Sequence, residues 1–346
     1  MTSDFVEFVA TLESPEFDVV NALKATTAEE SDPEPIGVLY PRRQPANGVV
    51  VRDGRTIARW GDIRVPDMAF SVSKALLSLC AGLAWTKGLI TDMHEPVGGW
   101  VSRLELGPDQ LTGIEDLGDT SWHHLLQQTG SWEGAVWGKH TSIDRQMDRY
   151  GHAANASGFA PGTRWNMNNV RVNLLALALS SVFEDSLESV LRRDIMNPLG
   201  GSGSWRWNGY ANSYCRLGGR MRQVVSGGAH WGGGIYISSA DLALIGKLCA
   251  GRGRFGAQQL LSPEWFDMAW DPCPVAPEGS GYLWHLNTGH ELSALAPASG
   301  VAALGGTHAL GVNMLWVDPD TDVVAVSRWM AFDRIGNFLD RMSANV

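Results

Sequence analysis

The chain has 346 residues, of which 44% are hydrophobic and 18% charged, which is enough for a large core and suits one bilobed domain or two closely packed ones. Its formal charge of -10 argues against nucleic acid or an anionic membrane as a partner, because both need a basic surface. The N-terminus lacks the basic and apolar regions of a secretory signal, and no apolar run reaches the ~20 residues that span a bilayer. We therefore expect a cytoplasmic protein.

The first predicted elements follow a proline-rich and acidic stretch at residues 27–46, which is typical of an extended connector. Residues 48–52 and 55–60 then flank the pair Asp53-Gly54, and this pattern predicts a β-hairpin. A short loop leads from the hairpin to an apolar helix that starts at Ser71 and ends near Gly88.

Ser71 and Lys74 lie one turn apart at the start of this helix, so a hydroxyl and an amine come within reach of each other. Apolar residues at positions 76, 79, 80 and 83 would desolvate Lys74, which lowers the pKa of an ammonium group. Backbone N–H groups at the helix start would face an oxyanion formed at Ser71. Taken alone, the same four residues also fit a helix cap followed by a surface lysine.

The rest of the chain is predicted to be helical first and then rich in strands. Helices are expected at residues 121–128 and 170–183, strands at 233–237, 281–287, 311–317 and 323–329, and a last helix at 333–342. Strands at both ends predict an α+β fold, with one antiparallel sheet built from both termini, flanked by helices, and an inserted helical lobe. We expect an α/β lobe at residues 1–85 and 226–346, a helical lobe at 86–225 and an active site in the cleft between them.

Cysteine and histidine spacing bears on metal binding. The four cysteines are far apart and form no C-x-x-C pair, so reduced structural thiols are favoured over disulfides or a metal cage. His123 and His124 are adjacent and point in different directions on a helix, and no H-E-x-x-H motif occurs. We expect no metal and no other cofactor.

Several ordered segments resemble motifs of one enzyme superfamily. They are residues 70–74 (FSVSK), 88–92 with Pro96, 122–130, 161–162, 238–243 and 261–264. Together they resemble the serine β-lactamase and penicillin-binding-protein superfamily, in its class C-like branch with family VIII carboxylesterases and 6-aminohexanoate-dimer hydrolase. The resemblance covers about residues 45–330 and implies a β-lactamase/transpeptidase-like fold, with Ser71 as nucleophile and Lys74 as base.

The second catalytic motif departs from the family pattern. The family has a Tyr-x-Asn triplet after Pro-Gly, and its tyrosine moves protons between the nucleophile and the leaving group. Here the triplet is Met167-Asn168-Asn169, so Asn169 fills the asparagine position while Met167 takes that of the tyrosine. A thioether neither donates nor accepts a catalytic proton. The two asparagines also suit N-capping of the helix that starts at Val170.

The third motif, Lys-Thr-Gly in β-lactamases, is absent, since no lysine follows Lys247. Residues 303–308 resemble the glycine-rich variants of the esterase and amidase members, which implies an oxyanion hole from the backbone N–H groups of Ser71 and Gly306. Alternatively, the glycines mark only a bulge or a close approach. Residues expected to bind substrate are Trp132, Trp137, His230, Trp231 and His308.

The sequence therefore predicts a serine hydrolase that cleaves a small carboxylic ester or amide through an acyl-enzyme on Ser71, with esters favoured because Met167 weakens the proton relay. One alternative is an acyltransferase that uses the same acyl-enzyme; another is a catalytically impaired homologue or an engineered Tyr-to-Met variant. β-Lactamase activity is disfavoured unless Arg222, Arg252 or Arg328 replaces the missing lysine. A monomer or a homodimer is expected.

Overall fold

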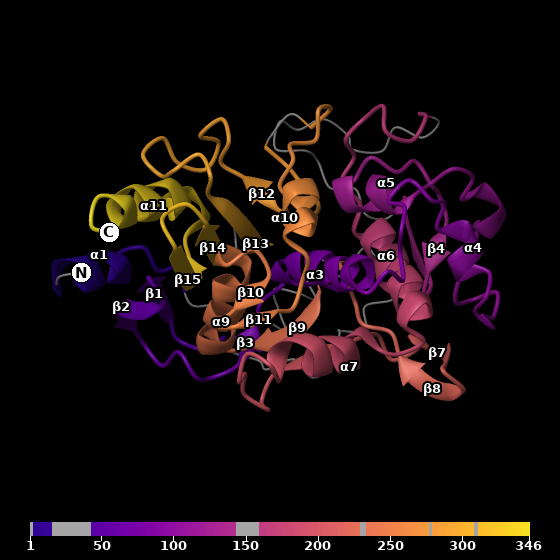
Figure 1. Cartoon of the computed structure of the whole chain (residues 1–346), viewed down its shortest axis with the longest axis horizontal. Coiled ribbons are helices and arrows are strands. Elements are labelled where there is room, and N and C mark those ends of the chain that lie inside the picture. Colours follow the sequence, from indigo (N-terminus) through magenta and orange to yellow (C-terminus); the bar gives the residue numbers. More distant parts are fainter. Residues whose placement is uncertain (1–2, 16–42, 143–158, 229–232, 277–278, 308–310) are drawn as a thin grey trace.

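The structure is a computed structural model that describes residues 3–15, 43–142, 159–228, 233–276, 279–307 and 311–346 (Figure 1). Its largest sheet has six strands in the order β12-β13-β14-β15-β1-β2, and all neighbours are antiparallel. The strands are β1 (Gly48–Arg52), β2 (Arg55–Trp60), β12 (His285–Leu286), β13 (Val301–Thr307), β14 (Gly311–Asp318) and β15 (Val323–Met330). Because β1 pairs with β15, the two ends of the chain meet in one sheet, which confirms the predicted α+β architecture.

The β1–β2 hairpin follows the sequence prediction. Asp53 and Gly54 have φ values of 47° and 70°, and positive φ at both central positions is what a type I′ hairpin turn requires. The residues of β1 also alternate between the two faces of the sheet. Val49 and Val51 join one core cluster, whereas Val50 joins the other.

Helices cover both faces of the sheet (Figure 1). One face packs against α1 and α11, whose Phe5 and Phe338 rings lie 6.0 Å apart. The other face packs against α3 and α9, so α3 is buried between the sheet and the helical part of the protein. These helices, with α10, are α1 (Ser3–Ala10), α3 (Val72–Thr86), α9 (Ser239–Ala250), α10 (Pro263–Ala269) and α11 (Ile335–Ser343).

The helical part is built around α6 (Asn169–Phe183), in which every residue except Phe183 is buried. It packs against α3, and α5 lies at its side. The other short elements are α4 (Gly98–Val101), η1 (Ile114–Asp116), α5 (Trp122–Gln127), β4 (Ala135–Val136), β5 (Lys139–His140), α7 (Leu187–Leu191), the single-turn π-helix η2 (Arg192–Met196), β7 (Tyr214–Leu217), β8 (Arg220–Gln223), β10 (Arg254–Phe255), β11 (Gln258–Gln259) and η3 (Phe332–Arg334).

A three-stranded sheet connects the two parts. Its order is β3-β9-β6, formed by β3 (Asp67–Met68), β9 (Gly234–Ile237) and β6 (Arg206–Asn208). Strand β6 lies within the range 86–225 expected for the helical lobe, yet it pairs with β9 across the expected boundary. The lobe boundaries stay a prediction.

The structure corrects the strand expected at residues 281–287, of which only His285–Leu286 is a strand. Tyr282 N donates to Ala269 O (2.8 Å), and Leu283 N donates to Leu126 O (3.0 Å). The first half of the segment therefore docks on α10 and α5 instead of extending the sheet. The four cysteines are buried free thiols, as expected. Within the described residues, none of the helices combines the length and hydropathy that a bilayer-spanning segment needs.

Candidate active site

Ser71 lies at the N-cap of α3, directly after a strained residue. Phe70 has φ of 50°, a left-handed conformation that bulky side chains rarely adopt and that costs on the order of 1–3 kcal/mol. Its ring packs edge-to-face on Trp329, with centroids 5.9 Å apart. This packing holds the backbone in the conformation that presents Ser71. The sequence contained no sign of either residue's role, because the contact joins residues that are far apart in the chain.

Lys74 contacts the Ser71 hydroxyl directly. Its Nζ donates a hydrogen bond to Ser71 Oγ at 2.7 Å, and the residue is only 8% exposed. An amine serves as a base only when it is neutral, and burial favours the neutral form. The helical geometry predicted that Ser71 and Lys74 lie within hydrogen-bond reach of each other, and the structure has them at that distance.

Strand β13 approaches the Ser71 backbone so closely that only glycine fits. A Cβ on Gly305 would lie 2.7 Å from Ser71 N and 2.2 Å from Ala69 O. Gly306, the next residue, has φ of 132°, and its Cβ would lie 2.0 Å from Gly311 O. The glycines thus mark a close approach, as one interpretation of the sequence held, and this approach sets the β13 backbone beside the nucleophile.

The second motif lies at the start of α6. Asn168 caps this helix, because its Oδ1 accepts from the backbone N–H groups of Val170 and Arg171. Asn169 is the first helical residue and is buried, whereas Met167 is half-buried. The helix-capping interpretation is therefore confirmed for Asn168, which leaves Asn169 as the residue at the asparagine position of the motif.

Asn173, one turn further along α6, is a residue that the sequence analysis missed. Its Oδ1 accepts from Gly227 N (3.0 Å) and Gly228 N (3.2 Å), and its Nδ2 donates to Tyr210 Oη (3.0 Å). Gly227 O in turn accepts from Ser73 Oγ (3.3 Å). Asn173 thus fixes the segment that lies between α6 and the nucleophile helix. A fully buried asparagine in an otherwise apolar run was the signal that could have revealed it.

Two predicted pocket residues belong to the core instead. Trp132 and Trp137 are 1% and 0% exposed, so neither presents an accessible face to a substrate. Trp132 Nε1 donates to Gly113 O (2.6 Å), which fixes the ring inside the protein. The assignment of both tryptophans to a substrate pocket is corrected for this reason. The other three expected pocket residues, His230, Trp231 and His308, lie outside the described residues.

The three arginines considered as replacements for the missing lysine are all engaged elsewhere. Arg328 is 1% exposed and donates to the carbonyls of Asp67, Met68 and Ile237, and its burial lowers the pKa of the guanidinium to about 10. Arg222 pairs with Asp185 at 3.3 Å, and Arg252 pairs with Asp267. Their guanidinium groups bind backbone carbonyls or surface carboxylates of the protein, and we therefore do not assign them to a substrate carboxylate beside Ser71.

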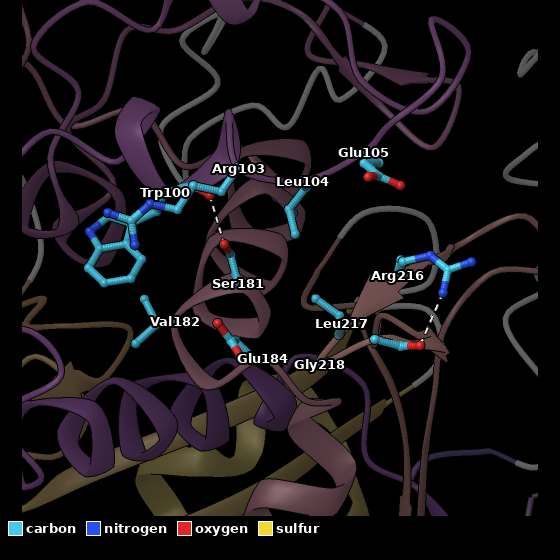
Figure 2. A pocket seen from close by; sticks show the side chains of 11 residues that line it. Trp100, Arg103, Leu104, Glu105, Ser181, Val182, Glu184, Arg216, Leu217 and Gly218 are labelled. Carbon is cyan, nitrogen blue, oxygen red and sulfur yellow. Dashed lines mark hydrogen bonds between the residues drawn. The ribbon is translucent and has the colours of Figure 1, made fainter.

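A cavity of about 330 Å³ lies at the opposite end of α6 from Asn169 (Figure 2). Its walls come from α4, the end of α6 and the β7–β8 turn, and its arginines already have partners. Arg103 stacks over Trp100 at 4.0 Å, and Arg216 Nη1 donates to Gly219 O (3.0 Å). The 15 residues of α6 separate this cavity from the motif at the helix start. In the part of the chain that the structure describes, no group of three His, Cys, Asp or Glu side chains is arranged to hold a metal ion.

Comparisons with known proteins agree on one family. A family model described as Beta-lactamase matches residues 46–327. No curated protein matches the chain. Among solved structures, a beta-lactamase from Mycobacterium bovis is 19% identical, with 88% of this chain and 95% of that chain covered and a TM-score of 0.58.

Two further solved structures are similar at lower identity. A candidate 6-aminohexanoate-dimer hydrolase from Bacillus anthracis is 14% identical, with 88% of this chain and 77% of that chain covered and a TM-score of 0.57. EstCE1, described as a hydrolase with promiscuous acyltransferase activity, is 14% identical, with 94% and 96% covered and a TM-score of 0.58. These similarities confirm the predicted β-lactamase/transpeptidase-like fold.

Proposed function

Because the chain belongs to the beta-lactamase family, we propose that it is a serine hydrolase that cleaves a small carboxylic ester or amide through an acyl-enzyme on Ser71. The observation that carries this proposal is the 2.7 Å hydrogen bond between Lys74 Nζ and Ser71 Oγ. It joins the two residues that the family's first motif assigns to catalysis, at the distance that proton transfer requires.

In the proposed mechanism, neutral Lys74 accepts the proton of Ser71 as Oγ attacks the carbonyl carbon of the substrate. The resulting oxyanion accepts hydrogen bonds from the backbone N–H groups of Ser71 and Gly306. Collapse of this intermediate releases the alcohol or amine, which takes the proton held by Lys74. Water then attacks the acyl-enzyme as Lys74 takes its proton, and Lys74 returns that proton to Ser71 Oγ when the carboxylic acid leaves. Asn169, at the start of α6, is the proposed polar contact for the substrate's acyl group.

Esters are the favoured substrates. The relay has Met167 where the family has tyrosine, so protonation of the leaving group depends on Lys74. The phenolate of an aryl ester departs without full protonation, whereas an amine has to be protonated first. β-Lactams that carry a carboxylate are disfavoured, because the third-motif lysine is absent and Arg222, Arg252 and Arg328 have other partners.

A panel of short-chain aryl esters tests the proposal, with Ser71→Ala as the control. The wild type should turn over at least one ester above the Ser71→Ala rate, and a fluorophosphonate probe should add one label to the wild type and none to the variant by intact-mass analysis. Equal turnover by both proteins, together with no labelling of the wild type, rejects the proposal.

An acyltransferase is a second candidate, favoured by the description of EstCE1 as a hydrolase with promiscuous acyltransferase activity. The same acyl-enzyme would then pass its acyl group to an alcohol or amine. Turnover of an aryl ester in the presence of an added alcohol separates the two, because a transferase forms a new ester where a hydrolase forms only the acid.

A catalytically impaired homologue, or an engineered Tyr-to-Met variant, is the remaining candidate, and Met167 is its motivation. Probe labelling of Ser71 at the rate of active serine hydrolases argues against it. A cytoplasmic location and a monomeric or homodimeric state remain predictions.

A further inference from the structure

A second cavity, of about 280 Å³, lies far from Ser71, between the end of α3, α5 and α10. Trp85 on its wall follows Ser71 by almost the whole of α3, which places it roughly 21 Å away at 1.5 Å per residue. Figure 1 shows α5 and α10 on the same side of α3. The cavity is therefore separate from the proposed active site.

Two side chains of α5, one turn apart, present polar groups to this cavity. His123 Nδ1 lies 2.6 Å from Tyr282 Oη, which leaves its second ring nitrogen for the cavity. Gln127 is only 6% exposed, and among the described residues its amide side chain makes no hydrogen bond. Because Gln127 lines the cavity and its amide has no protein partner within the part of the chain that the structure describes, it offers a donor and an acceptor to a ligand that carries a hydrogen-bonding group.

The cavity is acidic at neutral pH. Asp92 and Asp271 line it, and none of its lining residues is a lysine or an arginine. His123 adds no positive charge, because burial, followed by its neighbours His94 and His124, lowers the pKa of its imidazole to about 4. A cation is therefore the complementary charge for a ligand.

Much of the remaining wall is apolar, with Trp85, Met93 and Met268. The imidazole rings of His94 and His123 also line the cavity, tilted against each other with their centroids 4.6 Å apart. Aromatic faces attract organic cations such as quaternary ammonium groups. The His, Cys, Asp and Glu side chains of the described residues also form no trio with metal-binding geometry, so a metal ion is not the favoured occupant.

We propose that this cavity binds a small organic ammonium compound that carries a hydroxyl or carbonyl group. The ammonium group lies between Asp92, Asp271 and the aromatic wall, and the hydroxyl or carbonyl group pairs with Gln127. A ligand in this position contacts both α5 and the 282–283 segment that docks on it, so its binding also stabilises the packing between them.

Choline and its neutral isostere 3,3-dimethylbutan-1-ol test the proposal, with binding measured by isothermal titration calorimetry. The titrations use the Ser71→Ala variant, so a failure here is independent of the proposed hydrolase activity. Choline should bind at one site per chain, and the neutral alcohol should bind about tenfold more weakly. Equal affinity for both compounds, or no choline binding at millimolar concentration, overturns the proposal.

Variants of the carboxylates locate the site. Asp271→Asn and Asp92→Asn should each weaken choline binding by about fivefold to tenfold, because each removes one charge and keeps the side-chain shape. Asp116→Asn in η1 makes the same charge change outside the cavity and should leave the affinity unchanged. Unchanged affinity in both cavity variants, or tighter binding of Zn²⁺ than of choline with loss of Zn²⁺ binding in His94→Ala, contradicts the proposed ligand class.

Discussion

Replacing Gly305 with alanine places a methyl group against the backbone that carries Ser71. The Cβ would lie 2.2 Å from Ala69 O, 2.7 Å from Ser71 N and 2.8 Å from Val72 N, whereas real Cβ contacts are longer than 3.0 Å. All three atoms belong to backbone, so no side-chain rotation relieves the clash. Either β13 or the start of α3 has to move by close to an ångström.

The cost to stability and the cost to acylation should differ. Overpacking of this kind costs about 1–3 kcal/mol, which is a fraction of the ~5–15 kcal/mol that holds a domain folded. Each of the two segments carries one N–H group of the proposed oxyanion hole, Gly306 in β13 and Ser71 at the start of α3, and loss of one such donor lowers kcat by about 10²–10³. We expect Gly305→Ala to be folded at 25 °C and to acylate Ser71 about 10² times more slowly than the wild type.

The rate of fluorophosphonate labelling, followed by intact mass, measures acylation, and thermal unfolding measures stability. Gly99→Ala is the matched control. Gly99 lies in α4, and a Cβ there meets nothing within 4 Å, so this variant should label at the wild-type rate and gain up to about 1 kcal/mol of stability from the better helix former. Labelling of Gly305→Ala at the wild-type rate would refute the role given to the close approach of β13.

Three further predictions concern the base, the relay and the pH dependence. Lys74→Met should lower the probe-labelling rate of Ser71 by about 10²–10⁴, because the proposed base is lost, and labelling at the wild-type rate would show that another group accepts the proton. Met167→Tyr should raise ester turnover by at least about 10²-fold, by analogy with the large cost of removing one member of a catalytic unit; no change would mean that the chain uses a different proton path. The pKa of His123 is about 4 in the folded protein and near 6.5 when unfolded, so the unfolded state binds more protons between these values. The stability from neutral His123 is therefore fully present above pH 6.5 and lost as the pH falls towards 4, and urea unfolding midpoints should fall less steeply across this range in His123→Gln than in the wild type.

Local geometry explains which parts of the site were predictable. Ser71 and Lys74 are three residues apart on one helix, so the helix alone sets their distance, and the observed 2.7 Å follows once the helix forms. The Asp53-Gly54 turn is local in the same sense, since two positive φ values join strands that are adjacent in the chain. Both features depend on a few neighbouring residues, and both agree with the structure.

The features that the sequence did not predict depend on contacts between segments that are distant in the chain. Trp132 and Trp137 lie in loop-like sequence, which suggested exposure, yet the loops fold over a core that buries both rings completely. The approach of Gly305 to Ser71 joins segments separated by most of the chain, so periodicity carries no information about it. The glycine pattern left a bulge, a close approach and an oxyanion hole equally open, and three-dimensional contacts were needed to establish the close approach.

Asn173 bears on whether Met167 marks a decayed site or an altered one. Its side chain satisfies the N–H groups of Gly227 and Gly228, which lie in a buried segment where an unpaired donor costs about 1–3 kcal/mol. The same segment accepts the Ser73 hydroxyl one residue before Lys74, so the support behind the nucleophile helix is intact. The backbone behind the nucleophile helix is therefore held in place even though Met167 occupies the tyrosine position. We therefore expect Met167 to change how the leaving group obtains its proton and to leave Ser71 and Lys74 in position to form an acyl-enzyme.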